Sequence, residues 1–275
     1  MTVLLPPFLF EVVTAGEMAR RRAKFIQTMS SGYQGPVIIA EGDSWFCYPR
    51  DSALVPDNAP VDVIAQLSDE FAVNGVAKPG DTAQTMADFF HPSVTQDLQF
   101  WGAHLLLLSA GGNDLLGEGK LATFLRDGDR ALSQYLKPEF FGLVEGVLGR
   151  LERMVRAARE AKPDVKVLLH GYDYARPSGN GPWLKAPMVK LKIPAAKHRD
   201  IIKRIVDSFY SRLTAVADEL DQELADGAGE IVVLDLRSTV GASQWYDELH
   251  PSTDGFKQVR KRFRKRILEL HPLTG

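Results

Sequence analysis

Five segments of the chain are almost continuously apolar and do not alternate between apolar and polar residues. They cover residues 36–41, 71–76, 104–110, 165–171 and 230–236. Strands that are buried on both faces of a sheet have this pattern, because neither face requires polar side chains. The pattern therefore predicts five buried β-strands.

Helical spacing of apolar residues marks the segments between and after these strands. Residues 61–68 form a short segment of this kind, and longer ones cover residues 141–161, 195–225 and 254–270. Alternating strands and helices are typical of a parallel sheet with right-handed crossovers. No repeat, low-complexity tract or linker divides the sequence. We therefore expect one three-layer α/β/α domain over residues 1–275.

Composition narrows the range of partners. The 275 residues carry a formal net charge of −2, and 25% of them are charged. This balance argues against attraction of the whole molecule to nucleic acid or to an anionic membrane. Cys47 is the only cysteine, so the fold cannot depend on an internal disulfide.

The N-terminal residues lack the features of a signal peptide. No positive charge precedes their apolar run, two prolines and a glutamate interrupt it, and the basic residues follow it. No segment approaches the length of a membrane span. The sequence therefore predicts a cytoplasmic protein without an integral membrane segment.

Polar, glycine-rich turns follow several of the predicted strands. Residues 42–44 (Gly-Asp-Ser) follow the first strand, Gly80 follows the second, and residues 112–114 (Gly-Asn-Asp) follow the third. The fifth strand leads to Asp247 and His250, which are three positions apart. In an open parallel sheet, ligands bind beyond the carboxyl ends of the strands. The sequence therefore places these residues where a site should form.

These residue types match the needs of a serine nucleophile. Such a serine requires a base, a group that orients the base, and hydrogen-bond donors for the oxyanion. The Asp247 carboxylate can reach Nδ1 of His250 across one turn, which leaves Nε2 facing outward to serve Ser44. Gly80 allows close approach of a backbone N–H group, and Asn113 supplies a neutral amide donor.

The four blocks resemble those of the SGNH, or GDSL-type, hydrolase superfamily, which carry Ser, Gly, Asn and Asp-x-x-His in this order. The resemblance covers residues 37 to about 252. It implies a flavodoxin-like parallel sheet and a nucleophilic Ser44 served by His250 and Asp247. It also implies an oxyanion hole made by the N–H groups of Ser44 and Gly80 and the side chain of Asn113, with no metal and no cofactor.

Two features depart from the family pattern. Trp45 stands where the family usually has a small aliphatic residue, and Pro49 follows too soon for a long helix to start at Ser44. We therefore expect residues 47–62 to form an irregular loop beside the site. The departures change the shape of the pocket, so the substrate of a particular relative cannot be assigned to this protein.

Other polar residues near these turns have structural interpretations. We expect Asp43 and Asp114 to brace their loops through Asx-type hydrogen bonds. Cys47 is interpreted as a small buried apolar residue. His170 is interpreted as a satisfied, partly buried histidine, and the histidines show no spacing typical of metal ligands.

Aromatic residues near Ser44 suggest an apolar acyl or aryl group in the substrate. Trp45, Phe46 and Trp183 are the candidates for substrate contact. Trp183 belongs to residues 172–195, a long loop that could form a lid or substrate wall, or be a packed surface excursion. The basic residues of 257–266 favour a solvated helix face over contact with phosphate or anionic lipid.

The sequence thus predicts a serine esterase that acts on a small-molecule ester through an acyl-enzyme on Ser44. The ester could be a lipid, an aryl ester or an acetylated sugar. An acyltransferase or thioesterase with the same triad is the alternative. A non-catalytic binding module is disfavoured, because Ser44, Asp247 and His250 are all present. Since the base must be neutral to accept a proton, hydrolysis should fall as the pH drops.

Overall fold

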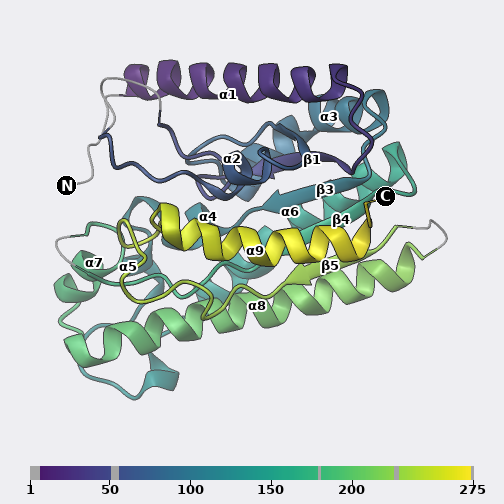
Figure 1. Ribbon diagram of the computed structural model, residues 1–275. Helices are drawn as coiled ribbons and strands as arrows, with labels where there is room; N and C mark the ends of the chain where they lie inside the picture. The colour runs from purple at the N-terminus through teal and green to yellow at the C-terminus, as the bar shows by residue number, and fades with distance from the viewer. Residues whose placement is uncertain (1–6, 51–55, 179–180, 226–228, 274–275) are drawn as a thin grey trace.

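A five-stranded sheet lies at the centre of the protein (Figure 1). The computed structural model describes residues 7–50, 56–178, 181–225 and 229–273. All strand pairs are parallel, in the order β2-β1-β3-β4-β5. The strands are β1 (Val37–Gly42), β2 (Ala72–Gly75), β3 (Leu105–Ser109), β4 (Lys166–His170) and β5 (Ile231–Leu234). Each overlaps one of the five predicted segments, which confirms the predicted α/β class and the flavodoxin-like parallel sheet.

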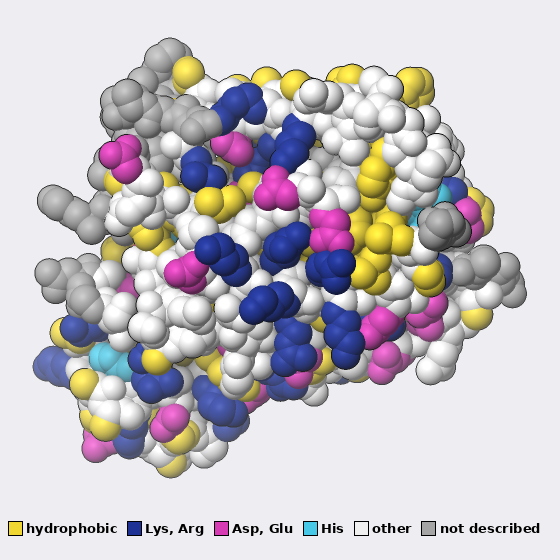
Figure 2. Space-filling model, viewed as in Figure 1, with side chains coloured by type: hydrophobic (Ala, Val, Ile, Leu, Met, Phe, Trp, Pro, Cys, Tyr) yellow, Lys and Arg dark blue, Asp and Glu magenta, His cyan; other side chains and the backbone are white. Residues whose placement is uncertain are grey.

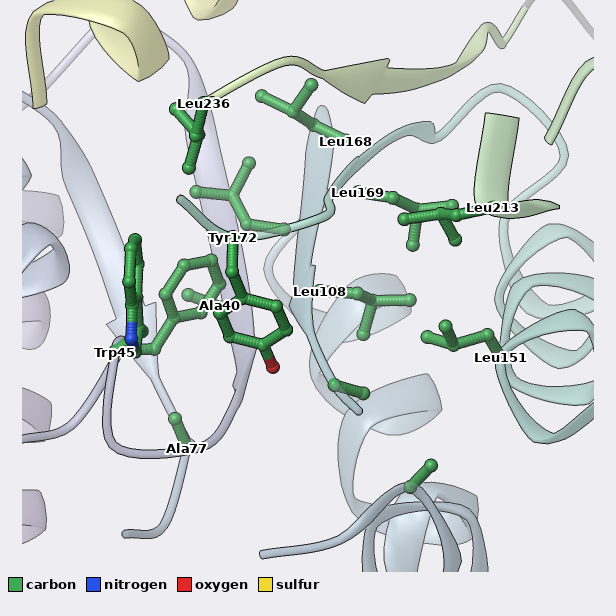
Figure 3. Close-up of a cluster of buried hydrophobic side chains, with 14 of the residues drawn as sticks. Ala40, Trp45, Ala77, Leu108, Leu151, Leu168, Leu169, Tyr172, Leu213 and Leu236 are labelled. Carbon is green, nitrogen blue, oxygen red and sulfur yellow. The ribbon is translucent and has the colours of Figure 1, made fainter. Parts of the chain in front are cut away.

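Helices cover both faces of the sheet, which explains why its strands are apolar on both sides. Helices α2 and α9 pack together on one face, while α3 and α6 pack together on the other (Figure 1). Leu108 of β3 lies near Leu151 of α6, and Leu169 of β4 lies near Leu213 of α8 (Figure 3). The larger helices are α1 (Pro7–Ser30), α3 (Ala83–Phe100), α6 (Pro138–Ala161), α8 (His198–Glu223) and α9 (Thr253–Leu270). The shorter ones are α2 (Val63–Leu67), α4 (Gly112–Leu116), α5 (Leu121–Phe124) and α7 (Lys185–Lys190).

Helix α3 was missing from the predicted elements. Its N-terminus carries a capping box, in which Thr82 and Thr85 satisfy each other's backbone N–H groups. Its buried apolar residues fall three or four positions apart and so form one stripe: Ala83, Met86, Phe90, Val94 and Leu98. The sequence Thr-x-x-Thr before this stripe was therefore a usable signal, although Pro92 within the segment argues against a helix.

Helix α1 was also missing, and long-range contacts hold it in place. The guanidinium of Arg21 is buried and donates to Oε1 of Glu17 at 2.8 Å and to the carbonyl of Phe46 at 2.6 Å. It also pairs with the Asp62 carboxylate, which caps α2 by accepting from the N–H of Ala65. These bonds connect α1 to the segment between β1 and α2, which local sequence patterns do not reveal.

Helix α9 presents its basic residues to solvent, as predicted. Phe256, Val259, Phe263 and Ile267 are fully buried beneath it. Lysine and arginine side chains gather on the face of the molecule that carries this helix (Figure 2). Several pair with acidic neighbours, for example with Glu70. These ion pairs agree with a solvated helix face.

Glu41, at the end of β1, carries a buried carboxyl group that should make stability depend on pH. Burial raises its pKa from 4.5 to about 8, although the N–H of Gly42 donates to its Oε1 at 2.8 Å. The folded protein therefore keeps a proton that the unfolded chain releases at lower pH. The sign follows from linkage: stability falls as the pH rises from about 5 to about 8, by roughly 1.4 kcal/mol per pH unit.

We expect Glu41→Gln to remove this contribution, because the amide keeps an oxygen acceptor and cannot ionise. Urea unfolding at pH 5, 6, 7 and 8 should show the variant gaining stability relative to the wild type as the pH rises. Glu160→Gln, which removes an exposed carboxylate, controls for the lost charge. A difference between Glu41→Gln and wild type that stays constant across this range would contradict the prediction.

Candidate active site

Ser44, His250 and Asp247 form a continuous row of hydrogen bonds at the carboxyl end of the sheet. Ser44 lies in the turn that follows β1, and its Oγ is 2.7 Å from Nε2 of His250. Nδ1 of His250 is 2.9 Å from each carboxylate oxygen of Asp247. The structure thus brings together three residues that the sequence separates by up to 206 positions.

The Asp247–His250 turn orients both side chains. Oδ1 of Asp247 accepts from the backbone N–H groups of Leu249 and His250, each at 2.8 Å. Burial opposes ionisation of Asp247, but its interaction with His250 and these N–H groups outweigh burial and lower its pKa below the usual value. A carboxylate that stays ionised can hold a proton on Nδ1, which leaves Nε2 free to accept from Ser44.

Gly42 allows β1 and β3 to approach closely beneath Ser44. In the sheet register Gly42 lies opposite Ser109. A Cβ atom at Gly42 would lie 2.7 Å from Cβ of Ser109 and 2.9 Å from its carbonyl oxygen. Because glycine has no side chain, β1 can lie this close to β3, and this position of β1 sets the position of Ser44.

A buried network below Ser44 confirms that Asp43 braces its loop. The Asp43 carboxylate accepts from the Ser109 hydroxyl at 2.9 Å and from the N–H of Trp45 at 3.0 Å. The Tyr172 hydroxyl donates to it at 2.5 Å and accepts from the N–H of Gly112 at 3.1 Å. Burial raises the pKa of Asp43 to about 6, against these hydrogen bonds. Tyr172 thereby connects the turn that carries Ser44 to the turn that carries Asn113.

Of the predicted oxyanion donors, Ser44 and Asn113 line the same pocket. Asn113 lines the pocket next to Ser44, and its side-chain amide donates to the carbonyl of Asp81 at 2.9 Å. Gly80, directly before Asp81, has a φ of +84°, which favours glycine. Gly80 is exposed and does not line the pocket. Asp114 braces this region, since its carboxylate accepts from the N–H of Ala83 at 2.9 Å.

One of the three predicted substrate contacts, Phe46, needs correction, whereas Trp45 lies at the pocket. Phe46 is fully buried, packs against His170 and Phe263, and does not line the pocket, so it belongs to the core. Trp45 lines the pocket but is only 4% exposed. Its indole N–H donates to the carbonyl of Leu249 at 3.1 Å, and its ring packs edge-on against Tyr172. Figure 3 shows this pair of rings within the core.

The structure corrects the interpretation of His170 and agrees with that of Cys47. His170 is not partly buried: it is 1% exposed, Nδ1 accepts from the N–H of Tyr172, and Nε2 has no hydrogen-bond partner among the described residues. Burial lowers the pKa of His170 to about 3, so the ring is neutral. Cys47 is buried as predicted, and burial raises the pKa of its thiol to about 12.

Aromatic rings flank the imidazole of His250. Trp183, a predicted contact, has its ring centroid 6.3 Å from that of His250, edge to face. Tyr48, which the sequence analysis missed, lies 5.1 Å away in the same type of contact. Tyr48 belongs to the predicted irregular loop at 47–62, which contains no helix or strand in its described part. Residues 51–55 of that loop lie outside the described residues.

Glu248 was missed because nothing in the sequence pattern distinguishes it from a solvent-facing loop residue. It is 1% exposed. Its carboxylate accepts from the backbone N–H groups of Trp183 at 3.0 Å, Leu184 at 2.9 Å and Lys185 at 2.8 Å. A Cβ atom on Gly181 would lie 1.9 Å from the Glu248 carboxyl carbon. One buried carboxylate thus holds the described part of the 172–195 loop against the turn that carries His250.

We expect Glu248→Gln to loosen this attachment, because an amide NH₂ would face backbone N–H donors. The free energy of unfolding should fall by about 1.5–3 kcal/mol, the usual loss for hydrogen bonds to a charged group. KM for ester substrates should rise, since Trp183 would lose its fixed position. Urea unfolding and steady-state kinetics measure both quantities, with Glu160→Gln as the exposed control. Unchanged stability and KM would show that the attachment is dispensable.

The predicted loop at 172–195 is irregular up to helix α7, and residues 179–180 lie outside the described residues.

The described residues contain no group of three or more His, Cys, Asp or Glu side chains arranged to hold a metal ion. No helix in the described part of the chain is long and apolar enough to span a membrane.

Comparison with known families decides the assignment of the chain. Residues 39–258 match the GDSL-like lipase/acylhydrolase family. The chain belongs to this family. The predicted relationship to SGNH hydrolases, and with it the prediction of an ester hydrolase, is confirmed. The family match includes Ser44, Gly80, Asn113, Asp247 and His250. A search of curated proteins found no match.

Solved structures share the fold of this GDSL-like hydrolase at low sequence identity. The lipase Lip_vut3 from a goat rumen metagenome has a TM-score of 0.53 and 16% identity, with 84% of this chain and 96% of that chain covered. An extracellular lipase from Streptomyces rimosus has a TM-score of 0.52 and 15% identity, with coverages of 84% and 99%. A carbohydrate esterase family 3 protein from Talaromyces cellulolyticus has a TM-score of 0.50 and 13% identity, with coverages of 85% and 97%.

Proposed function

We propose that this GDSL-like hydrolase is a serine esterase that cleaves carboxylic esters through an acyl-enzyme on Ser44. The observation that carries the proposal is the row of hydrogen bonds from Ser44 through His250 to Asp247. The row lies at the mouth of a pocket, because Ser44 and His250 both line it. A nucleophile, its base and the group that orients the base are therefore present beside a space for substrate.

In the first half of the reaction, Oγ of Ser44 attacks the carbonyl carbon of the ester and transfers its proton to Nε2 of His250. Asp247 accepts the hydrogen bond from Nδ1 and stabilises the imidazolium. The negative oxygen of the tetrahedral intermediate accepts from the N–H groups of Ser44 and Gly80 and from the amide of Asn113. The bond to the alcohol oxygen then breaks, and His250 returns the proton to the leaving alcohol.

In the second half, a water molecule attacks the acyl carbon while His250 takes one of its protons. The same donors stabilise the second tetrahedral intermediate. When this intermediate collapses, the bond to Oγ of Ser44 breaks and His250 returns the proton to it. The carboxylic acid leaves, and the free enzyme is restored.

The alcohol part of the ester would lie beside the two rings that flank His250. The leaving oxygen must come close to Nε2 of His250 to receive its proton. Tyr48 and Trp183 contact that imidazole edge to face and do not line the pocket. We therefore assign residues 183–185 of the predicted lid loop, which Glu248 holds, to the wall on the alcohol side.

A fluorophosphonate ester tests the proposal directly, because it phosphonylates an activated serine and is not turned over. We expect one adduct per chain, located on Ser44 by peptide mass spectrometry, with loss of p-nitrophenyl acetate hydrolysis in proportion to labelling. Ser93, an exposed serine on α3, is the internal control and should stay unlabelled. An unlabelled Ser44 in a folded protein would overturn the proposal.

A further inference from the structure

A small pocket lined by Ser44 also has residues of helices α4 and α8 in its walls. Leu115 and Leu116 of α4 line one side, and Ile205, Val206 and Phe209 of α8 line the other. The enclosed volume is about 50 Å³. The walls formed by α4 and α8 are therefore aliphatic and aromatic, and the volume is small.

The floor of this pocket is fixed in place. Phe209 is 1% exposed and packs beside Tyr172, with ring centroids 6.5 Å apart. Gly111 leaves room for the Phe209 ring, since a Cβ there would lie 2.9 Å from its Cζ atom. Tyr172 itself is held by Asp43 and by the N–H of Gly112. A longer ligand could therefore not push the floor away without breaking the network beneath Ser44.

Two carboxylates that line the pocket, those of Asp43 and Asp173, are already engaged by protein donors. The Asp43 carboxylate accepts from three donors, as described above. The Asp173 carboxylate accepts from the backbone N–H groups of Tyr174, Ser238 and Val240, each at 2.6 Å. A polar ligand group would have to compete with these bonds, whereas an alkyl group would not. The pocket thus favours an apolar occupant.

The direction of the pocket identifies which part of an ester enters it. Asn113, the proposed oxyanion donor, lines this pocket together with Ser44. His250, which protonates the alcohol oxygen, also borders the pocket, but Tyr48 and Trp183, the rings on the alcohol side of His250, do not line it. With the oxyanion and the alcohol oxygen directed to these places, the pocket is left for the acyl chain.

The volume then limits the length of that chain. An apolar cavity of about 150 Å³ binds a benzene-sized ligand, so a pocket of about 50 Å³ has room for only a short chain of roughly two to four carbons. We propose that this protein hydrolyses esters of short acyl groups, from acetyl to about butyryl, and that Phe209 excludes chains of about eight carbons or more. The inference rests on the proposed function and names the substrate class of the same site.

The test measures kcat/KM for p-nitrophenyl esters with acyl chains of two, four, eight and twelve carbons. For the wild type we expect a drop of about tenfold or more between four and eight carbons. Phe209→Leu shortens the floor residue and should raise the ratio of eight-carbon to four-carbon activity. Phe141→Leu, the same change at an exposed phenylalanine of α6, should leave that ratio unchanged.

A second variant tests the pocket in the opposite direction and guards against a misfolded Phe209 variant. Ala175 lines the pocket and is 8% exposed. Ala175→Val should narrow the pocket and lower four-carbon activity relative to two-carbon activity. Circular dichroism and thermal unfolding show whether each variant is folded.

The outcomes separate this inference from the proposed function. Equal or greater wild-type activity on eight- and twelve-carbon esters overturns the short-acyl inference and leaves the serine esterase intact. A fluorophosphonate adduct on Ser44 without hydrolysis of any of the four esters also overturns the inference, but not the nucleophile. If neither an adduct on Ser44 nor hydrolysis of any ester is observed, the proposed function is overturned, and the inference falls with it.

Discussion

Ser44→Ala should lower kcat/KM for p-nitrophenyl acetate by about 10⁴-fold or more, since removal of a nucleophile from a triad costs at least this much. The reason is geometric: Oγ of Ser44 is the group within 2.7 Å of Nε2 of His250 at the mouth of the pocket. The alanine variant should fold normally, because this hydroxyl contributes little to packing at the surface of the pocket. Initial rates under excess substrate, with thermal unfolding as the check on folding, measure both effects.

Ser93→Ala provides the matched control for this change. Ser93 is exposed on α3 and its hydroxyl donates to the carbonyl of Phe89 within the same helix. We expect wild-type kinetics for this control. If Ser44→Ala retained even a tenth of wild-type activity, the nucleophile would have to be another residue, and Ser44 would only end its strand.

Asp247→Asn should lower kcat at pH 7 by about 10³–10⁴-fold while leaving the fold unchanged. In the wild type, Oδ1 of Asp247 accepts from the N–H groups of Leu249 and His250, and both oxygens face Nδ1 of His250. An asparagine that keeps its oxygen on the backbone donors must point its NH₂ group at Nδ1. Nδ1 of His250 must then accept a hydrogen bond from this NH₂ group, which places the imidazole proton on Nε2. Ser44 therefore loses its base.

The pKa of Asp247 gives this second prediction its pH dependence. Because interactions with His250 and the N–H groups outweigh burial and lower the pKa, the wild-type carboxylate stays ionised at and above pH 5. The Asn variant should therefore be impaired throughout the range from pH 5 to pH 8. Asp254→Asn, which removes an exposed carboxylate from the first turn of α9, should behave as wild type. A loss below tenfold in Asp247→Asn would argue against its orienting role.

The four sequence blocks could be located before the structure because each depends on local chemistry. Continuous apolar runs define buried strands, and a glycine or polar residue directly after a run marks its carboxyl end. In a parallel sheet all these ends meet at one edge, so the order of blocks was sufficient to assemble Ser44, Asn113, Asp247 and His250 into one candidate site.

Residues that act through distant partners could not be located in this way. Glu248 resembles any charged loop residue until the folded chain brings the N–H groups of 183–185 to its carboxylate. Phe46 was expected to contact substrate because it follows Ser44 closely, yet the turn directs its ring into the core. Tyr48 similarly contacts His250 only because the fold brings together two residues that are 202 positions apart in the chain.

By itself, the sequence determined the parallel α/β class, the family resemblance and the identity of the candidate nucleophile, base and orienting acid. These properties follow from periodicity and from residue chemistry, which are local. Only the tertiary structure decided the size of the acyl pocket, the ring contacts around His250 and the attachment of the 172–195 loop. Pocket volume depends on how α4, α8 and Tyr172 pack together, and packing is set by contacts between residues far apart in the chain.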